Sequence, residues 1–262
     1  MPPTKKRPFR FMYSGENNGY INMAMDEAVM TGLKDHHSTP VLRIYKWKPP
    51  TISIGYFQSA SDIDFENIEK DGVGVVRRLT GGRAVLHDEE LTYSILFTEE
   101  DFSPFKKREI FVFIARCLVD ALNLIGIDSK IVEKTKGDLK SPNCFASPAQ
   151  YEIEAMKEGK LIGSAQMIKN GVVVQHGAIP LTGSYTRIVK YLKSGSPSFK
   201  SVSSLTQASC NNIGEKELLK ALKKGFGNHL HLIEGRLSDY ENKITDELSV
   251  KKYSQEYWMY RK

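Results

Sequence analysis

Two residues with chemical potential stand near the middle of the chain, a cysteine, Cys144, and a lysine, Lys160. Cys144 lies in a short stretch bounded by Pro142 and Pro148, and this composition favours a loop over a helix or a strand. A lysine ammonium beside a cysteine stabilises the thiolate, which is the nucleophilic form of the side chain. We therefore predict that Cys144 is a nucleophile and that Lys160 is its electrostatic partner.

The elements predicted around this pair form an antiparallel meander. Apolar and polar residues alternate over 151–156, as is typical of a strand. Residues 157–159 are of types that favour a turn, and residues 160–162 begin a second strand. The Asn-Gly pair at 170–171 is a strong hairpin signal, and residues 172–175 read as a third strand. Because residues distant in sequence meet across such a sheet, the cysteine and the lysine can be neighbours.

A second stretch with binding potential runs from residue 74 to residue 94. It contains two adjacent arginines, Arg77 and Arg78, followed by a loop with the glycine pair Gly81-Gly82. Glycines let a ligand approach the backbone closely, and the arginines suit a negative or carbonyl group. A simple hairpin turn explains the glycines equally well, and the stretch is not a P-loop.

Composition narrows the class of protein. The chain has 262 residues, 40% hydrophobic and 26% charged, as is ordinary for a globular protein, and no apolar run approaches a membrane span. The basic first residues lack the apolar segment of a secretion signal, so we predict a cytoplasmic protein without a membrane partner. The net charge of +6 fits an acidic protein partner, a carboxylate or phosphate ligand, or simply surface lysine. No nucleic-acid-binding motif is present, and we predict no nucleic-acid partner.

The cysteines and histidines do not form a metal-binding or disulfide pattern. The three cysteines, Cys117, Cys144 and Cys210, make no CxxC pair, and no HExxH motif occurs. We predict no protein-bound metal and no cofactor. Cys117 lies beside the apolar stripe of a predicted helix, so we assign it to packing.

The remaining elements predict an α+β protein of one domain, residues 1–262, with mixed and largely antiparallel sheets flanked by helices. The helix over 103–125 has the clearest signals, with Ser103 as cap, Pro104 at its first position and Gly126 at its end. A Ser-, Gly- and Pro-rich stretch, 194–212, predicts a surface linker to the C-terminal helices. Other predicted helices cover 18–33, 64–71, 185–193, 215–230 and 238–251, and the aromatic tail, 253–260, is expected to pack back on the body.

Two stretches together resemble the lipoate–biotin ligase-like superfamily of cofactor-attaching acyltransferases. They are the run Arg-Arg-Leu-Thr-Gly-Gly-Arg-Ala-Val-Leu-His-Asp at 77–88, and Gly-Lys-Leu-Ile-Gly-Ser-Ala-Gln at 159–166 with Gln-His-Gly at 175–177. The likeness covers well over half of the chain. Within the superfamily the chain is most similar to the LipM-type octanoyltransferases, because Cys144 stands in Asn-Cys-Phe-Ala-Ser-Pro. An acidic residue expected near that alanine is missing.

The resemblance implies a biotin/lipoate ligase-like fold and an octanoyl thioester on Cys144. It implies that Lys160 lowers the pKa of the thiol and helps to place the acyl carbonyl. It also implies the partners, octanoyl-acyl carrier protein as donor and the lysine of a lipoyl domain, such as glycine cleavage H protein or a dehydrogenase E2, as acceptor. The substrate-binding positions are then Arg77, Arg78, Gly81, Gly82, Arg83, His87, Gly163, Ser164, Ala165, Gln166, His176 and Gly177.

Several alternatives stay open. The proton of the incoming lysine could be accepted by His87 or by water, and the acyl tunnel is expected from strand residues such as Val76, Leu79 and Val85. The chain could instead be an ATP-dependent lipoate ligase, an amidotransferase between two lipoyl domains, or a catalytically silent binder of nucleic acid or acyl ligands. Acyl labelling of the cysteine without ATP separates the first of these from octanoyl transfer.

Overall fold

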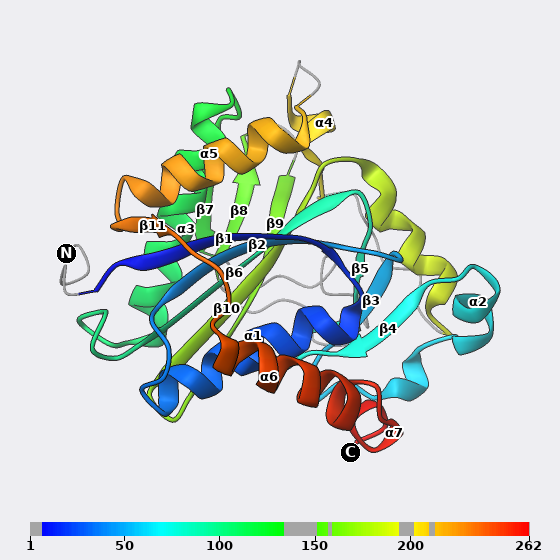
Figure 1. Cartoon of the computed structure of the whole chain (residues 1–262). Helices are drawn as coiled ribbons and strands as arrows, with labels where there is room; N and C mark the ends of the chain where they lie inside the picture. Colours follow the sequence, from blue (N-terminus) through cyan, green and yellow to red (C-terminus); the bar gives the residue numbers. More distant parts are fainter. Residues whose placement is uncertain (1–6, 134–150, 157–158, 194–201, 210–212, 262) are drawn as a thin grey trace.

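The computed structural model describes residues 7–133, 151–156, 159–193, 202–209 and 213–261. Its strands are β1 (Phe9–Asn17), β2 (Val41–Trp47), β3 (Thr51–Ile54), β4 (Gly74–Arg77), β5 (Val85–His87), β6 (Glu90–Thr98), β7 (Ser129–Glu133), β8 (Tyr151–Ala155), β9 (Gly159–Lys169), β10 (Val172–Pro180) and β11 (Leu232–Glu234). They form a large sheet in the order β11-β1-β2-β6-β10-β9-β8-β7 and a small sheet in the order β4-β3-β5 (Figure 1).

Helices cover both faces of the large sheet. The α-helices are α1 (Gly19–Lys34), α2 (Phe65–Lys70), α3 (Lys107–Leu124), α4 (Leu205–Ala208), α5 (Glu215–Gly227), α6 (Asp239–Leu248) and α7 (Glu256–Met259). Further helical turns are η1 (Ala60–Asp62), η2 (Gly183–Tyr191) and η3 (Ser249–Tyr253). Helices α3 and α5 pack together on one face, and α1 and α6 pack on the other, with the small sheet beside α1 (Figure 1).

The α+β prediction is confirmed. Every pairing from β2 through β6, β10, β9 and β8 to β7 is antiparallel, whereas β1 runs parallel to both of its neighbours. The predicted meander is present: Asn170 and Gly171 have φ angles of 51° and 72° at the hairpin between β9 and β10. Positive φ at both central residues is what a two-residue hairpin turn requires.

Three predicted elements differ from the structure. Helix α3 begins at Lys107 instead of 103, because the chain turns first between Pro104 and Lys106 and Ser103 makes no cap. Most of the helix predicted over 185–193 falls in the 3₁₀ segment η2, Gly183–Tyr191, and is not α-helical. In the described part of the predicted surface linker, Leu205 is fully buried in the main core and α4 forms, since an apolar side chain at this position fills the space under the sheet.

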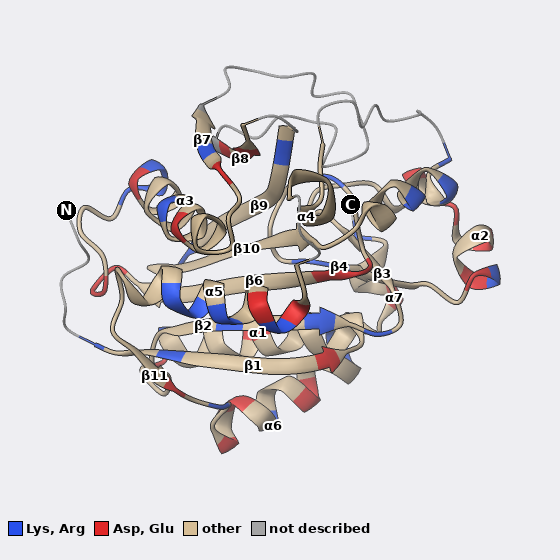
Figure 2. Cartoon of the chain, turned by 90° about the horizontal axis from the view of Figure 1, so that it is seen from above, with Lys and Arg blue, Asp and Glu red and all other residues tan. Residues whose placement is uncertain are grey.

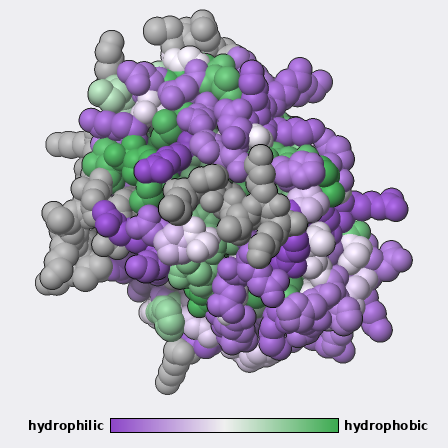
Figure 3. Space-filling view, turned by 90° about the vertical axis from the view of Figure 1, so that its left-hand side faces the viewer, coloured by the Kyte–Doolittle hydropathy of each residue, from purple (hydrophilic) through white to green (hydrophobic). Residues whose placement is uncertain are grey.

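Acidic and basic residues are interspersed along the helices that flank the large sheet (Figure 2). Both α3 and α5 carry acidic and basic residues (Figure 2). The face shown in Figure 3 is mainly hydrophilic and is broken only by separate apolar patches. No helix in the described part of the chain has both the length and the apolar character needed to cross a membrane.

Candidate active site

A narrow cavity lies where the two sheets meet. Its walls come from α1, both sheets and the segment after β4, so that residues from most of the chain converge on it. The lining residues are Met23, Tyr45, Trp47, Ser53, Arg78, Val85, His87, Thr92, Gly163, Ser164, Ala165, His176, Gly177 and Ala178. Of the twelve substrate-binding positions expected from the sequence, seven are in this set.

The other five positions lie elsewhere. Gly81 and Gln166 line a separate open groove, and Gly82 is exposed in the loop between β4 and β5. Arg83 is half-buried, and its carbonyl accepts a hydrogen bond from Arg78. Of the three tunnel residues expected from the strands, only Val85 lines the cavity, while Val76 and Leu79 pack in an apolar cluster with Trp47 and Trp258.

The two adjacent arginines, Arg77 and Arg78, have different roles in the structure. Neighbouring residues of an extended chain point to opposite sides, so Arg77 and Arg78 diverge. The Arg77 guanidinium is buried and donates to the carbonyl oxygens of Gly55, Gln58 and Met259 at 2.5–2.8 Å, which anchors the C-terminal tail to the small sheet. Arg77 therefore contributes to the site only by holding the structure around it.

Arg78 braces the glycine loop from the cavity side. Its guanidinium donates to the carbonyls of Gly81 and Arg83, both at 2.8 Å, and to the carbonyl of Ser53 at 2.8 Å. Its Nε also donates to the hydroxyl of Thr80 at 3.2 Å. A buried guanidinium with this many backbone acceptors fixes the loop at one side of the cavity.

Glycine is required at the cavity wall because the strands approach closely. A Cβ atom on Gly177 would lie 2.6 Å from the Tyr93 ring and 2.7 Å from the Ser164 hydroxyl. A Cβ atom on Gly55 would lie 1.9 Å from the carbonyl oxygen of Gly82. At these positions a side chain would displace the wall or the loop, which explains the glycines in physical terms.

Lys160 is buried at the start of β9. Its Nζ lies 2.7 Å from Oε1 of Glu152 on β8, and both side chains are at most 3% exposed. Its backbone is also fixed, because the amide of Ser203 donates to the Lys160 carbonyl at 2.8 Å. The positive charge thus has a defined place on the strand that, three residues later, forms the cavity wall.

A buried polar network supports the cavity from α1. The Asp26 carboxylate accepts hydrogen bonds from Arg43 at 2.6 Å and Ser94 at 2.8 Å, and its second oxygen lies 3.8 Å from Nδ1 of His176. Burial acts to raise the pKa of Asp26, but the Arg43 charge and these polar contacts hold it below its ordinary value. Burial lowers the pKa of His176, so this imidazole is neutral near pH 7.

Sequence reasoning did not assign roles to the acidic partners in this region, Asp26, Glu90 and Glu152. One signal was available for Asp26, since Asn22 and Asp26 lie one turn apart on the helix face that is otherwise apolar. The partnership of Glu152 with Lys160 depends on an irregular register between β8 and β9, and no sequence pattern announces it.

Of the three cysteines, only Cys117 lies among the described residues. Cys117 is fully buried on α3 in the main core, and burial raises the pKa of its thiol, so the thiol stays protonated. This agrees with the predicted packing role. Cys144 and Cys210 lie outside the described residues, and the pairing of Cys144 with Lys160 stays a prediction.

Comparison with known proteins places this chain in one family. The model of the lipoyl protein ligase A/B catalytic domain matches residues 18–227, and the chain belongs to that family. Among curated proteins it is 36% identical to octanoyltransferase LipM of Clostridioides difficile, covering 95% of this chain and 97% of the relative. It is 34% identical to octanoyltransferase LipM of Bacillus subtilis, covering 98% and 100%.

Solved structures agree with this assignment. A lipoate-protein ligase A bound with ATP superposes with a TM-score of 0.79 at 27% identity, over 97% of this chain and 98% of the other. The bipartite lipoate protein ligase of Thermoplasma acidophilum superposes with a TM-score of 0.78 at 25% identity, over 97% and 96%.

Proposed function

We propose that this protein is an octanoyltransferase that moves an octanoyl group from a carrier-protein thioester to the lysine of a lipoyl domain, in protein lipoylation. The observation that supports this most directly is the buried side chain of Lys160, which pairs with Glu152 of β8 and stands on β9, the strand that continues into the cavity wall. The full-length relatives that carry the name octanoyltransferase support the same reaction class.

In the first step, the Cys144 thiolate attacks the carbonyl carbon of the donor thioester. A new carbon–sulfur bond forms, the old one breaks, and the donor leaves as a thiolate that takes up a proton. One thioester replaces another, so this step is close to balanced in free energy. The Lys160 ammonium stabilises the attacking thiolate and then the oxyanion of the tetrahedral intermediate.

In the second step, the lysine amine of the lipoyl domain attacks the acyl-enzyme. A carbon–nitrogen bond forms and the carbon–sulfur bond to Cys144 breaks, which returns the cysteine to its thiolate. The conversion of a thioester to an amide is downhill, so the reaction does not need ATP. Splitting one transfer into two steps is the advantage of a covalent intermediate.

We infer that the acyl chain lies against the apolar part of the cavity lining. Met23, Val85 and Ala178 give it apolar walls, and the glycines Gly163 and Gly177 allow close approach of a chain to the backbone. Both proposed partners, a carrier protein and a lipoyl domain, are typically acidic, and the net charge of +6 favours their approach.

The test is intact-mass measurement after incubation with octanoyl-carrier protein in the absence of ATP. We expect one octanoyl adduct on the wild-type protein, no adduct on Cys144→Ala, and discharge of the adduct by an apo lipoyl domain. Cys117→Ala is the matched control and should acylate normally. A requirement for ATP together with full activity of Cys144→Ser would contradict the proposal and indicate a ligase.

A further inference from the structure

Three polar side chains from three strands form a connected chain at one side of the cavity. The Ser53 hydroxyl on β3 lies 2.8 Å from Nε2 of His87 on β5. Nδ1 of the same imidazole lies 2.7 Å from Oε1 of Glu90 on β6. Ser53 and His87 line the cavity, and all three side chains are buried.

The direction of these hydrogen bonds follows from their neighbours. Arg78 donates from Nη1 to the Ser53 hydroxyl oxygen at 3.1 Å, so the hydroxyl proton points to His87. A carboxylate only accepts, so Nδ1 of His87 carries the proton that Glu90 binds. Nε2 is then the unprotonated nitrogen, and a proton delivered to Ser53 can move on to it.

The imidazole is held in this orientation by a second set of contacts. The Trp47 ring stacks on it with a centroid distance of 4.1 Å and an interplanar angle of 10°. The Trp47 indole N–H donates to Thr92 at 2.7 Å, and the Thr92 hydroxyl donates to Oε1 of Glu90 at 2.6 Å. These contacts therefore fix the plane of the His87 ring relative to the Glu90 carboxylate.

The second step of the proposed reaction needs a proton acceptor, and two other candidates suit the role less well. Lys160 is paired with the Glu152 carboxylate at 2.7 Å and serves as the cation of the proposed first step. His176 has a similar arrangement, with Nε2 at 2.6 Å from the Thr80 hydroxyl, but its Nδ1 is 3.8 Å from a carboxylate that Arg43 already neutralises.

The charged groups around His87 differ from those around His176. Among the described residues Glu90 has no lysine or arginine partner, and its Oε2 is buried without a hydrogen bond. A proton on His87 would thus give a neutral pair with a carboxylate in direct contact. Arg78 opposes this protonation, but it acts from beyond Ser53, whereas Glu90 touches the ring.

We propose that Ser53, His87 and Glu90 form a proton relay for the lysine that attacks the acyl thioester, an inference that rests on the proposed function. As the carbon–nitrogen bond forms and the carbon–sulfur bond breaks, the nitrogen gives a proton to the Ser53 oxygen. The Ser53 hydroxyl proton passes to Nε2 of His87, and the new imidazolium pairs with Glu90. Release of that proton to solvent restores the neutral imidazole, and Cys144 leaves the step as its thiolate. Ser53 contacts the reacting nitrogen, His87 accepts the proton, and Glu90 is a positioning residue.

The experiment separates the two steps. The octanoyl-enzyme is formed first with octanoyl-carrier protein, isolated, and discharged by an apo lipoyl domain across a pH series. We expect His87→Gln and Ser53→Ala to lower the maximal discharge rate about 100-fold, with Glu90→Gln somewhat less affected. Acylation should change less than about threefold in each variant, because general-base help is not needed for a thiolate attack.

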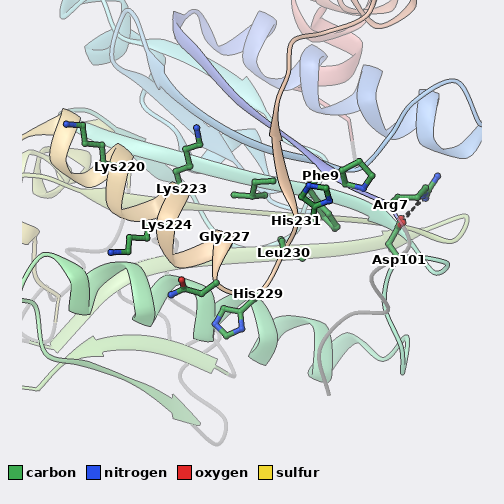
Figure 4. A pocket seen from close by; sticks show the side chains of 13 residues that line it. Arg7, Phe9, Asp101, Lys220, Lys223, Lys224, Gly227, His229, Leu230 and His231 are labelled. Atoms are coloured by element: carbon green, nitrogen blue, oxygen red, sulfur yellow. Dashed lines mark hydrogen bonds and ion pairs between the residues drawn. The ribbon is translucent and has the colours of Figure 1, made fainter.

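Two controls exclude a purely structural effect. Hydroxylamine is a neutral nucleophile at pH 7, and it should discharge the variants at the wild-type rate. His229→Gln removes a histidine with an equally short carboxylate contact, 2.6 Å to Asp120, at a groove on the other side of the sheet (Figure 4), and should change neither step.

The outcomes are distinct. Loss of lysine discharge with normal acylation, normal hydroxylamine discharge and an altered pH profile supports the relay. Normal acylation with normal lysine discharge in His87→Gln overturns the relay and leaves the proposed function intact. Absence of any octanoyl adduct on the wild-type protein overturns both.

Discussion

The cavity between the sheets and the groove beside α5 contain the same kind of contact in opposite surroundings. His87 and Glu90 are 2.7 Å apart in the cavity, with side chains 7% and 2% exposed. His229 and Asp120 are 2.6 Å apart beside the groove, with side chains 32% and 38% exposed. The distance between histidine and carboxylate is therefore nearly the same in the two pairs, and the pairs differ in how far water reaches them.

The groove is wide and its cations face solvent. Lys220, Lys223 and Lys224 project from α5 along one side, while Arg7 reaches Asp101 at the far end (Figure 4). Charges in such a place are screened and can be exchanged with water at little cost. In the cavity, each charge has a protein partner that water cannot replace, so we expect substitutions there to have far larger effects.

The largest effect is expected for Lys160→Ala. The change removes the buried ammonium that lies 2.7 Å from the Glu152 carboxylate, and we expect a loss of about 3–5 kcal/mol in the free energy of unfolding. The acylation rate should fall about 10²–10³-fold, because the charge that we propose stabilises the oxyanion is lost. Urea unfolding and timed mass spectrometry measure the two effects.

The double variant Lys160→Ala with Glu152→Gln removes the buried charge of Glu152 as well. It should regain much of the stability without regaining the acylation rate. If the double variant acylated at the wild-type rate, Lys160 would be structural only.

Asp26→Asn is expected to have the next largest effect, about 3 kcal/mol at pH 7, because Arg43 loses its buried counter-charge. The folded-state pKa of Asp26 is lowered, so its contribution is complete above the unfolded value of about 4 and is lost as the pH falls through the folded value. Urea midpoints at pH 7, 5 and 3 should show a weaker acid dependence in the variant. An equal loss of stability in acid for both proteins would contradict this role.

Gly177→Ala should cost about 1–3 kcal/mol, because the added Cβ meets the Tyr93 ring and the Ser164 hydroxyl. Gly81→Ala is the matched control: no heavy atom lies within 4 Å of the added Cβ, and its unfolding free energy should change by less than about 0.5 kcal/mol. Thermal unfolding compares the two. Equal losses of unfolding free energy in the two variants would mean that the strands at the cavity wall shift to accommodate the added Cβ at little cost.

The smallest effect is expected for the double charge reversal Lys220→Glu and Lys224→Glu in the groove. Neither lysine has an ion pair among the described residues, so stability should change by less than about 1 kcal/mol. Acylation by a small octanoyl thioester should remain unchanged, as measured by intact mass. A large loss in that assay would show that the groove and the cavity are coupled.

The sequence predicted many of the residues of the site but not how their side chains are arranged. The motif around Arg77 and Arg78 indicated a ligand-binding region, but adjacent residues of an extended chain face opposite ways, and only Arg78 reaches the cavity. The predicted helix over 103–125 has the correct C-terminal end at Gly126 and a wrong start, because the Ser-Pro signal is also compatible with the turn that the chain makes there. Cys117 was correctly assigned to packing from its place beside the apolar stripe.

The acidic partners were harder to foresee. Glu152, Glu90 and Asp26 look like ordinary surface carboxylates in sequence, since charged side chains are rarely buried. Asp26 finds its partners Arg43 and Ser94 on strands far along the chain, whereas Glu90 and Glu152 pair with residues three and eight positions away on neighbouring strands. The pairing of Glu152 with Lys160 further depends on a register shift between β8 and β9, which no local pattern encodes.

The sequence by itself determined the family, the α+β class, the hairpin at Asn170-Gly171 and the residue types available for acyl chemistry. These features are local: they depend on periodicity, turn chemistry and short motifs. Only the tertiary structure decided which carboxylate pairs with Lys160, which arginine faces the cavity, and that Ser53, His87 and Glu90 form one chain. The reason is that burial and distance between remote segments set the energy of a charge, and neither quantity exists until the sheets have packed together.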